Sequence, residues 1–245
     1  MKILLAPAEI KVEGGDQPPL CRDNFSFKEI YENRIEVINN YEEFIKKSTQ
    51  EELSKWFGIK KTDDVVKYSK SILNKPTMKA IQRYTGVAFE ALDYNKLNKN
   101  TQAYVDENVV LFSNIFGAIK ASDLIPDYKY KQGSKLPTID VEKHYKKYLK
   151  DVFDNFLGDE VIDIRAGYYD KYYKPVANTI TYKFLKDGKV VSHWAKYYRG
   201  ELLKHIAQNN IQNFTELMNL EIPKLKLVEI QEKKNIKTLI MEIID

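Results

Sequence analysis

The sequence predicts a single compact α+β domain spanning residues 1–245, with a mixed sheet and flanking helices. Apolar runs of strand length are interspersed with amphipathic segments of helical period, but they follow no regular strand–helix–strand rhythm. The chain contains no internal repeat, no low-complexity tract and no clear linker. With 43% hydrophobic and 30% charged residues, its composition is that of a globular protein.

The N-terminal segment is predicted to form the first buried strand. Residues 2–7 are mostly apolar, and Glu9 and Lys11 follow too soon for a signal peptide. Helical periodicity begins near Ser26 and continues through Ile45.

Two short helices joined by a tight turn are expected next. The run Ser48-Thr-Gln-Glu-Glu52 is typical of a capping box and predicts a helix over residues 50–57, which Gly58 can end. Thr62 can cap a second helix over residues 63–73.

The middle of the chain predicts buried strands at residues 109–113 and 161–164. Helical spacing over residues 140–156, ended by Gly158, separates them. Before them, residues 76–84 are expected to form an amphipathic or strand-like segment, and helices are expected at residues 87–92 and 98–108.

A β-hairpin is the clearest signal in the C-terminal part. Residues 179–185 and 189–197 alternate around Asp187-Gly188, a pair that favours a type I′ turn. The remaining segments are predicted as a helix at 195–209, a turn or short helix at 214–220, and a closing strand pair at 224–230 and 237–243.

Composition narrows the possible classes of protein. No apolar run approaches the roughly 20 residues that span a bilayer. The single cysteine, Cys21, excludes an internal disulfide framework and favours the reducing cytoplasm. The three histidines show no metal-ligand spacing, and no glycine-rich nucleotide loop occurs, so no metal or cofactor is expected.

The net charge of +4 is small but unevenly distributed. Residues 115–205 contain 17 Lys and Arg against 12 Asp and Glu, a balance of +5 that leaves −1 for the rest. A local basic surface is one interpretation, and a generally solvated lysine-rich surface is the other.

Three groups of residues are candidates for binding anions. Lys60 and Lys61 lie in the turn between the two short helices, an arrangement similar to a helix-hairpin-helix, although any two helices joined by glycine share it. Lys196 and Arg199 fall on one helical face, where they suit a phosphate or pair structurally with nearby acids. The third group interleaves cations with four tyrosines, which can stack bases or simply form a domain wall: Arg165, Tyr168, Tyr169, Lys171, Tyr172, Tyr173 and Lys174.

Five blocks of the chain follow one another in a recognisable order. They are Lys2-Ile-Leu-Leu-Ala-Pro-Ala-Glu9, Arg83-Tyr-Thr-Gly-Val-Ala-Phe-Glu-Ala-Leu92, residues 112–133, residues 161–175 and Ala195-Lys-Tyr-Tyr-Arg-Gly200. Together they resemble the YaaA family of peroxide-stress proteins, in which the first block reads Ile-Leu-x-Ser-Pro-Ala-Lys and the last reads Ala-Lys-x-Ala-Arg-Gly.

The resemblance implies a cytosolic protein of the hydrogen-peroxide response that limits free iron. It further implies a YaaA-type α+β fold and sequence-independent binding of double-stranded DNA through a basic cleft and a helix-hairpin-helix element. Positions of this sequence that match the family's polar positions are Lys120, Asp123, Tyr128, Lys129, Lys171, Lys196 and Arg199. Glu9 stands where the family has a lysine, Ser122 where it has a leucine, and Lys120 and Lys129 where it has arginines, which removes bidentate geometry but keeps the charge.

These observations lead to two main hypotheses. In the first, a non-enzymatic protein binds duplex DNA through Lys60, Lys61, Lys120, Lys129, Lys171, Lys196 and Arg199. In the second, Asp123 and Lys196 form the acid–base site of an enzyme acting on a small anionic or nucleotide substrate. A third option is an interaction module with an indirect effect on iron.

Overall fold

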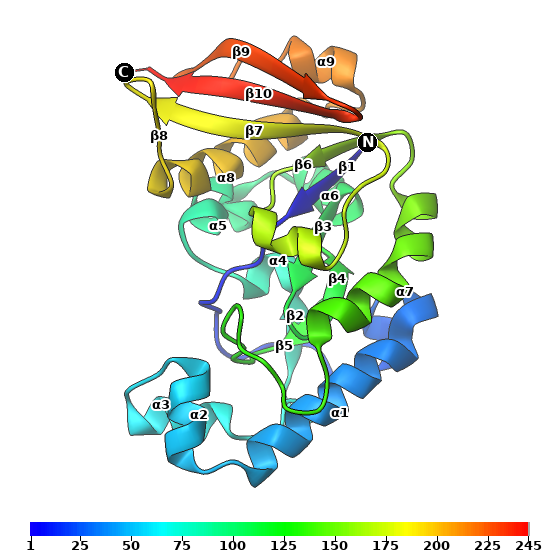
Figure 1. Ribbon diagram of the computed structural model, residues 1–245, viewed down its shortest axis with the longest axis vertical. Helices are drawn as coiled ribbons and strands as arrows, with labels where there is room; N and C mark the ends of the chain where they lie inside the picture. The colour runs from blue at the N-terminus through cyan, green and yellow to red at the C-terminus, as the bar shows by residue number, and fades with distance from the viewer. Residues whose placement is uncertain (245) are drawn as a thin grey trace.

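A computed structural model describes residues 1–244 and contains a mixed sheet of eight strands (Figure 1). The predicted mixture of helices around a mixed sheet is confirmed. In spatial order the main path of the sheet is β4 (Gly117–Lys120), β3 (Val109–Ser113), β1 (Lys2–Leu5), β6 (Glu160–Asp163), β7 (Asn178–Lys186), β10 (Ile236–Ile243) and β9 (Leu225–Lys233), with β8 (Lys189–Val190) paired to β7.

The middle of this sheet is parallel. β1 pairs with β3 and β6, and the parallel arrangement continues through β7 to β10. Ile3 pairs with Val109 on one side and Ile162 on the other, and all three side chains are fully buried. Strands buried on both faces need continuous apolar runs, which explains why these short segments could be recognised from the sequence.

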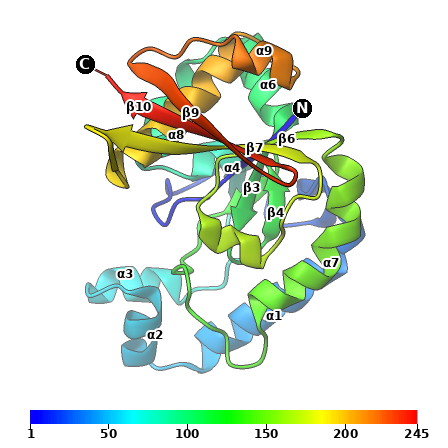
Figure 2. The same cartoon turned by 45° about the horizontal axis from the view of Figure 1, so that its top comes forward.

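The helices cover the sheet and extend below it. Figures 1 and 2 show α1 and α7 along one side of the molecule, α5, α6 and α8 around the upper part, and α2 and α3 together at the lower end. Their bounds are α1 (Tyr31–Lys47), α2 (Gln50–Phe57), α3 (Thr62–Tyr68), α4 (Ala80–Arg83), α5 (Val87–Leu92), α6 (Lys99–Asn108), α7 (Val141–Phe156), α8 (His193–Gln208) and α9 (Phe214–Met218). Four 3₁₀ helices, η1 (Arg22–Asn24), η2 (Lys28–Ile30), η3 (Tyr94–Lys96) and η4 (Gly167–Lys171), and a small sheet of β2 (Thr77–Lys79) and β5 (Leu124–Pro126) complete the described part.

Local sequence signals predicted several elements correctly. The helix α2 has the predicted bounds, and its capping box is formed by Thr49 and Glu52, each of which accepts from the other's backbone N–H. Gly58 ends α2 in the left-handed region at φ 67°, where glycine carries no steric penalty. The positive φ angles of Asp187 and Gly188 agree with the predicted type I′ turn.

Other predicted bounds were wrong. The helix α3 stops at Tyr68 rather than residue 73, and its N-cap is Lys61, which makes no side-chain cap hydrogen bond. The second hairpin strand ends at Val190, because residues from His193 onward belong to α8. Two strands, β4 and β5, lie in a part of the chain to which the sequence analysis assigned no element.

No helix within residues 1–244 combines the length and the apolar character needed to cross a bilayer.

The contact between α5 and α8 yields a first prediction. A Cβ atom at Gly200 would lie 2.0 Å from the carbonyl oxygen of Ala88, which is backbone and cannot swing aside. Gly200→Ala should therefore separate the two helices and lower the free energy of unfolding by about 3 kcal/mol. Urea unfolding measures the change, with Gly167→Ala as the control, since a Cβ there meets nothing within 4 Å. Equal stability of the two variants would contradict this packing.

Candidate nucleic-acid interface

The carboxyl edge of the parallel strands is where this topology favours a site. From β1 the chain first reaches β3 on one side and later β6 on the other. Such a switch in strand order leaves the segments after neighbouring strands free to diverge, and ligands of open α/β sheets bind there. In this chain, those segments are residues 6–12 after β1 and residues 164–171 after β6.

The segment after β1 is held in place by a buried lysine. Lys11 Nζ donates to the carbonyl oxygens of Ala8 (3.4 Å) and Glu9 (3.3 Å) and lies 4.1 Å from the ring centroid of Tyr128. Beneath it the Tyr128 hydroxyl hydrogen-bonds those of Tyr84 and Ser113, both at 2.8 Å. This network fixes the backbone from Ala8 to Lys11 against the end of β3.

Burial weakens the charge of Lys11. Desolvation and, to a lesser extent, the nearby Lys129 lower the pKa of this amine to about 7, although Asp127 and Glu9 oppose the shift. Lys11 therefore acts mainly as a positioning group for the segment.

The two short helices present an exposed pair of cations. In the connection between α2 and α3, the Ser54 hydroxyl donates to the carbonyl of Ile59 at 2.6 Å. This bond and the left-handed Gly58 define the turn, in which Lys60 and Lys61 are both exposed. A helix-hairpin-helix usually has a Gly-hydrophobic-Gly turn, and here Lys60 stands at the place of the second glycine, after Gly58 and Ile59.

The loop of residues 127–135 connects this turn to the segment after β1. A Cβ atom at Gly58 would lie 3.2 Å from Cδ of Lys131, so the Lys131 side chain covers the turn. Two contacts join the loop to Glu9: the backbone N–H of Gln132 donates to Glu9 Oε1 at 3.4 Å, and Lys129 Nζ lies 3.9 Å from Glu9 Oε2.

Helices α5 and α8 extend this series of contacts along the same side of the molecule. A Cβ at Gly86, the residue before α5, would lie 4.0 Å from that of Ala8, and α8 packs on α5 through Gly200. Near its N-terminal end α8 carries Lys196, which is exposed, and Arg199, which is partly buried. Burial lowers the pKa of the Arg199 guanidinium, and Asp163 at the end of β6 partly compensates.

These contacts form a continuous path, and Figures 1 and 2 show its parts on one side of the molecule: α2–α3, the segment after β1, and the start of α8. We call the cations along it the basic strip, which consists of Lys60, Lys61, Lys131, Lys129, Lys196 and Arg199. Within residues 1–244, Lys60, Lys61, Lys131 and Lys196 take part in no ion pair. Glu9, whose side chain is 48% exposed, is the acid in its middle.

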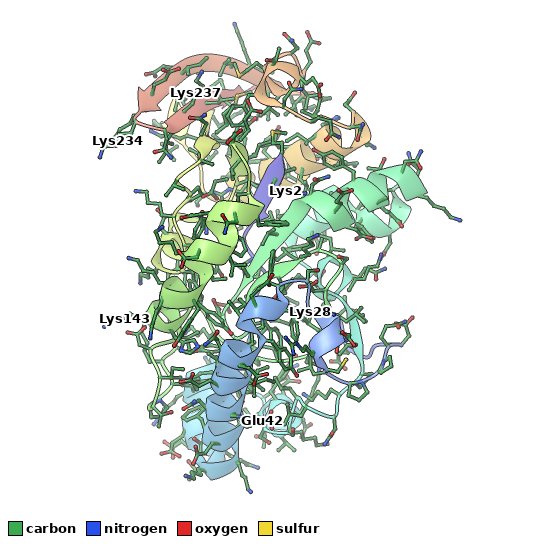
Figure 3. The ribbon with its side chains drawn as sticks, turned by 90° about the vertical axis from the view of Figure 1, so that its right-hand side faces the viewer. Lys2, Lys28, Glu42, Lys143, Lys234 and Lys237 are labelled. Carbon is green, nitrogen blue, oxygen red and sulfur yellow. The ribbon has the colours of Figure 1, made fainter. Side chains whose placement is uncertain are left out.

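One predicted anion-binding residue, Lys120, lies apart from the strip. Lys120 lies at the other edge of the sheet, because β4 runs back alongside β3 and pairs Lys120 with Val110. Its amine and that of Lys2 both lie 5.3 Å from the ring of Phe156, and Figure 3 shows Lys2 from that side. Lys171 belongs to η4 in the segment after β6, at the carboxyl edge of the sheet, and it is exposed with its amine 4.6 Å from the ring centroid of Tyr168.

Asp123 and Lys196, which the enzyme hypothesis predicts to form an acid–base site, do not lie together. The buried carboxylate of Asp123 accepts from the Ser26 backbone (3.0 Å) and hydroxyl (2.5 Å) and from the backbone N–H of Lys120 (3.0 Å). Asp123 therefore organises the turn after β4, whereas Lys196 lies on α8, which packs against β7 and α5. Three strands separate β4 from β7.

The third sequence candidate is largely structural. Arg165 donates to both carboxylate oxygens of Asp163, at 2.9 and 2.7 Å, and to the carbonyls of Tyr169 and Tyr173. Its side chain is almost fully buried, as are Tyr169 and Tyr173. No group of three or more His, Cys, Asp and Glu within the described residues is placed to hold a metal ion.

Sequence reasoning did not select Lys11 or Lys131 as site residues. Lys131 follows the aromatic run that contains Lys129, so its neighbours gave a usable signal. Nothing in the sequence around Lys11 indicated that its amine turns back onto the carbonyls of its own loop.

Comparison with known proteins supports the family resemblance of the five sequence blocks. A family model described as peroxide stress protein YaaA matches residues 1–231. The chain belongs to this family.

Relatives are similar over most of their length. "Uncharacterized protein Cj0984" of Campylobacter jejuni is 43% identical over 246 residues, covering 100% of both chains. A UPF0246 protein of Corynebacterium glutamicum is 31% identical over 232 residues, covering 90% of this chain and 91% of its own. A UPF0246 protein of Streptomyces coelicolor is 28% identical over 217 residues, covering 84% and 82%. The similarity therefore extends over the whole chain in the first of these relatives and over most of it in the other two.

The buried amine of Lys11 makes a prediction about pH. The folded-state pKa of about 7 lies below the ordinary lysine value of 10.5, so between these values the unfolded chain binds a proton that the folded chain lacks. Stability should therefore rise with pH across this window, by about 1.4 kcal/mol for each unit of pKa shift.

Lys11→Met should remove that rise. Unfolding free energies from urea titrations at about pH 6.5 and about pH 9 measure it, with Lys143→Met, at an exposed position, as the control. If the variant and the original chain gain equal stability over this interval, Lys11 is charged in the folded state.

Proposed function

We propose that this member of the peroxide stress family binds double-stranded DNA without sequence preference along the basic strip. In this proposal α2 and α3 act as a helix-hairpin-helix-like element, and the chain works as one domain in the cytoplasm. The observation that carries the proposal is the continuity of contacts from Lys60 and Lys61 through Lys131 to the segment after β1 and α8.

The chemistry of the strip favours a polyanion over a small ligand. Within residues 1–244 its exposed lysines take part in no ion pair, and they come from three segments, the α2–α3 turn, the loop of residues 127–135 and the start of α8, which are spread along one side of the molecule (Figure 1). Lysines interact with phosphate as point charges and tolerate variation in geometry. This suits a DNA backbone, which offers phosphates at regular intervals and carries no sequence information directly.

Acidic side chains at two places restrict how DNA can approach the basic strip. Glu9 lies beside Lys129 in the middle of the strip, and Asp63 and Asp64 are exposed in the first turn of α3. These carboxylates repel phosphate, so the DNA backbone should approach Lys60 and Lys61 from the side of Lys131. The expected affinity is correspondingly moderate and strongly dependent on salt.

Removal of the turn lysines tests the interface. Lys60→Ala/Lys61→Ala should weaken binding to duplex DNA and reduce the slope of log K against log salt by about 0.9 for each lost phosphate contact. Fluorescence anisotropy with two unrelated duplex sequences measures both quantities, and the losses should be the same for each sequence.

Lys146→Ala/Lys147→Ala is the matched control. It removes the same charge from another adjacent exposed pair, on α7 at the far side of the molecule (Figure 1). An equal effect of the two double variants would show that net charge alone governs binding, and would refute the proposed interface.

We also propose that the protein limits free iron during peroxide stress, which family membership supports. Cells that lack the chain should then hold more chelatable iron after exposure to hydrogen peroxide, and restoring the chain should lower it. Electron paramagnetic resonance of the chelated ferric iron measures this pool. Equal iron levels with and without the chain would contradict this part of the proposal.

A further inference from the structure

Two aromatic side chains are exposed together at the start of α8. The ring of Trp194 is close to that of Tyr197, with centroids 6.1 Å apart and planes at 87°. Trp194 is 50% exposed and Tyr197 37% exposed. Large aromatic rings left open in this way are typical of surfaces that bind a partner.

The rings are held by the core behind them. Trp194 lies 6.3 Å from Tyr198, which is buried and stacks on Phe184 of β7 at 5.8 Å. Phe184 in turn stacks on Tyr182 at 6.2 Å with planes at 12°. A ring that is anchored on one face and open on the other loses little conformational freedom when a flat group stacks on it.

The charge around this pair favours a polyanionic partner. Residues 183–199 contain five Lys and Arg against one Asp, a balance of +4 that equals the net charge of the whole chain. Lys189 and Lys196 are exposed close in sequence on either side of Trp194. Lys196 and Arg199 of the basic strip therefore lie on the same helix as the rings.

Acidic residues lie beyond Tyr197. A shallow groove of about 280 Å³ next to this ring is lined by Glu90, Asp93 and Glu201, with Lys204 as its cation. Phosphates are repelled there. A bound strand therefore has its backbone on the side of Lys189 and Lys196.

We propose that Trp194 and Tyr197 stack on unpaired bases of single-stranded nucleic acid, at a site that extends the basic strip. The inference rests on the proposed function, because the strip supplies the backbone contacts. Stacking is independent of base identity, since every base has a π-face. The protein thus prefers DNA that contains a single-stranded segment over fully paired duplex of the same length.

Tryptophan fluorescence tests this directly, since the chain has two tryptophans, Trp56 and Trp194. In a Trp56→Phe background Trp194 is the sole emitter. Adding a thymidine oligonucleotide should quench its emission strongly, whereas an abasic oligonucleotide of equal length and charge should not. Equal quenching by the two, or none by either, overturns the proposal.

Substitutions at Trp194 separate stacking from general apolar contact. Trp194→Leu should lower affinity for the thymidine oligonucleotide about tenfold, with little change for the abasic one. Trp194→Phe, which keeps an aromatic ring, should recover most of the loss. Unchanged affinity in Trp194→Leu overturns the proposal and leaves the exposed rings as a surface for protein partners.

Parallel titration with duplex DNA keeps the two proposals distinguishable. Duplex binding without quenching by the thymidine oligonucleotide refutes only the stacking site. Quenching without duplex binding refutes duplex recognition and retains the single-strand site.

Discussion

The guanidinium of Arg83 is the constraint on which the site depends. It is fully buried and donates to the carbonyl oxygens of Val12 (2.5 Å), Gly14 (2.8 Å), Pro76 (3.3 Å) and Ile125 (3.2 Å). One planar cation thus ties the segment after β1 to the small sheet of β2 and β5, and from β5 the chain runs directly into the loop that carries Lys129 and Lys131. A lysine at this position could not satisfy so many carbonyls in one plane.

The cationic side chains of this fold have two distinct roles. Arg34, Arg83 and Arg165 are buried and satisfy backbone carbonyls or a neighbouring carboxylate, so they stabilise irregular backbone. Lys60 and Lys196 are exposed and unpaired within the described residues, so their charge is available to a partner. A local excess of positive charge in the sequence therefore overstates the basic surface, because Arg165 contributes to the count but not to the surface. This division favours recognition of a phosphate backbone by exposed lysines on a rigid scaffold.

Local patterns predicted α2, β3 and α5 within a residue, because caps and short apolar runs act over a few positions. The parallel order of the sheet depends on contacts between distant segments, which no local pattern encodes. Residues 193–197 fit both strand alternation and helical spacing. They form a helix because Tyr198 then packs on Phe184 and Gly200 packs on Ala88. Of the predicted anion-binding residues, Lys60, Lys61, Lys129, Lys196 and Arg199 do lie along one side. Lys120 does not, because the unrecognised strand β4 reverses the chain and returns it to the opposite edge.

The central claim is that distant segments form one surface for DNA. Hydrogen exchange of the intact chain, with and without duplex DNA, tests it without any substitution. The account predicts slower exchange in three places together: the α2–α3 turn, residues 127–135, and the first turns of α8. Exchange that slows instead around Lys2 and Lys120, or in only one of the three segments, would contradict it.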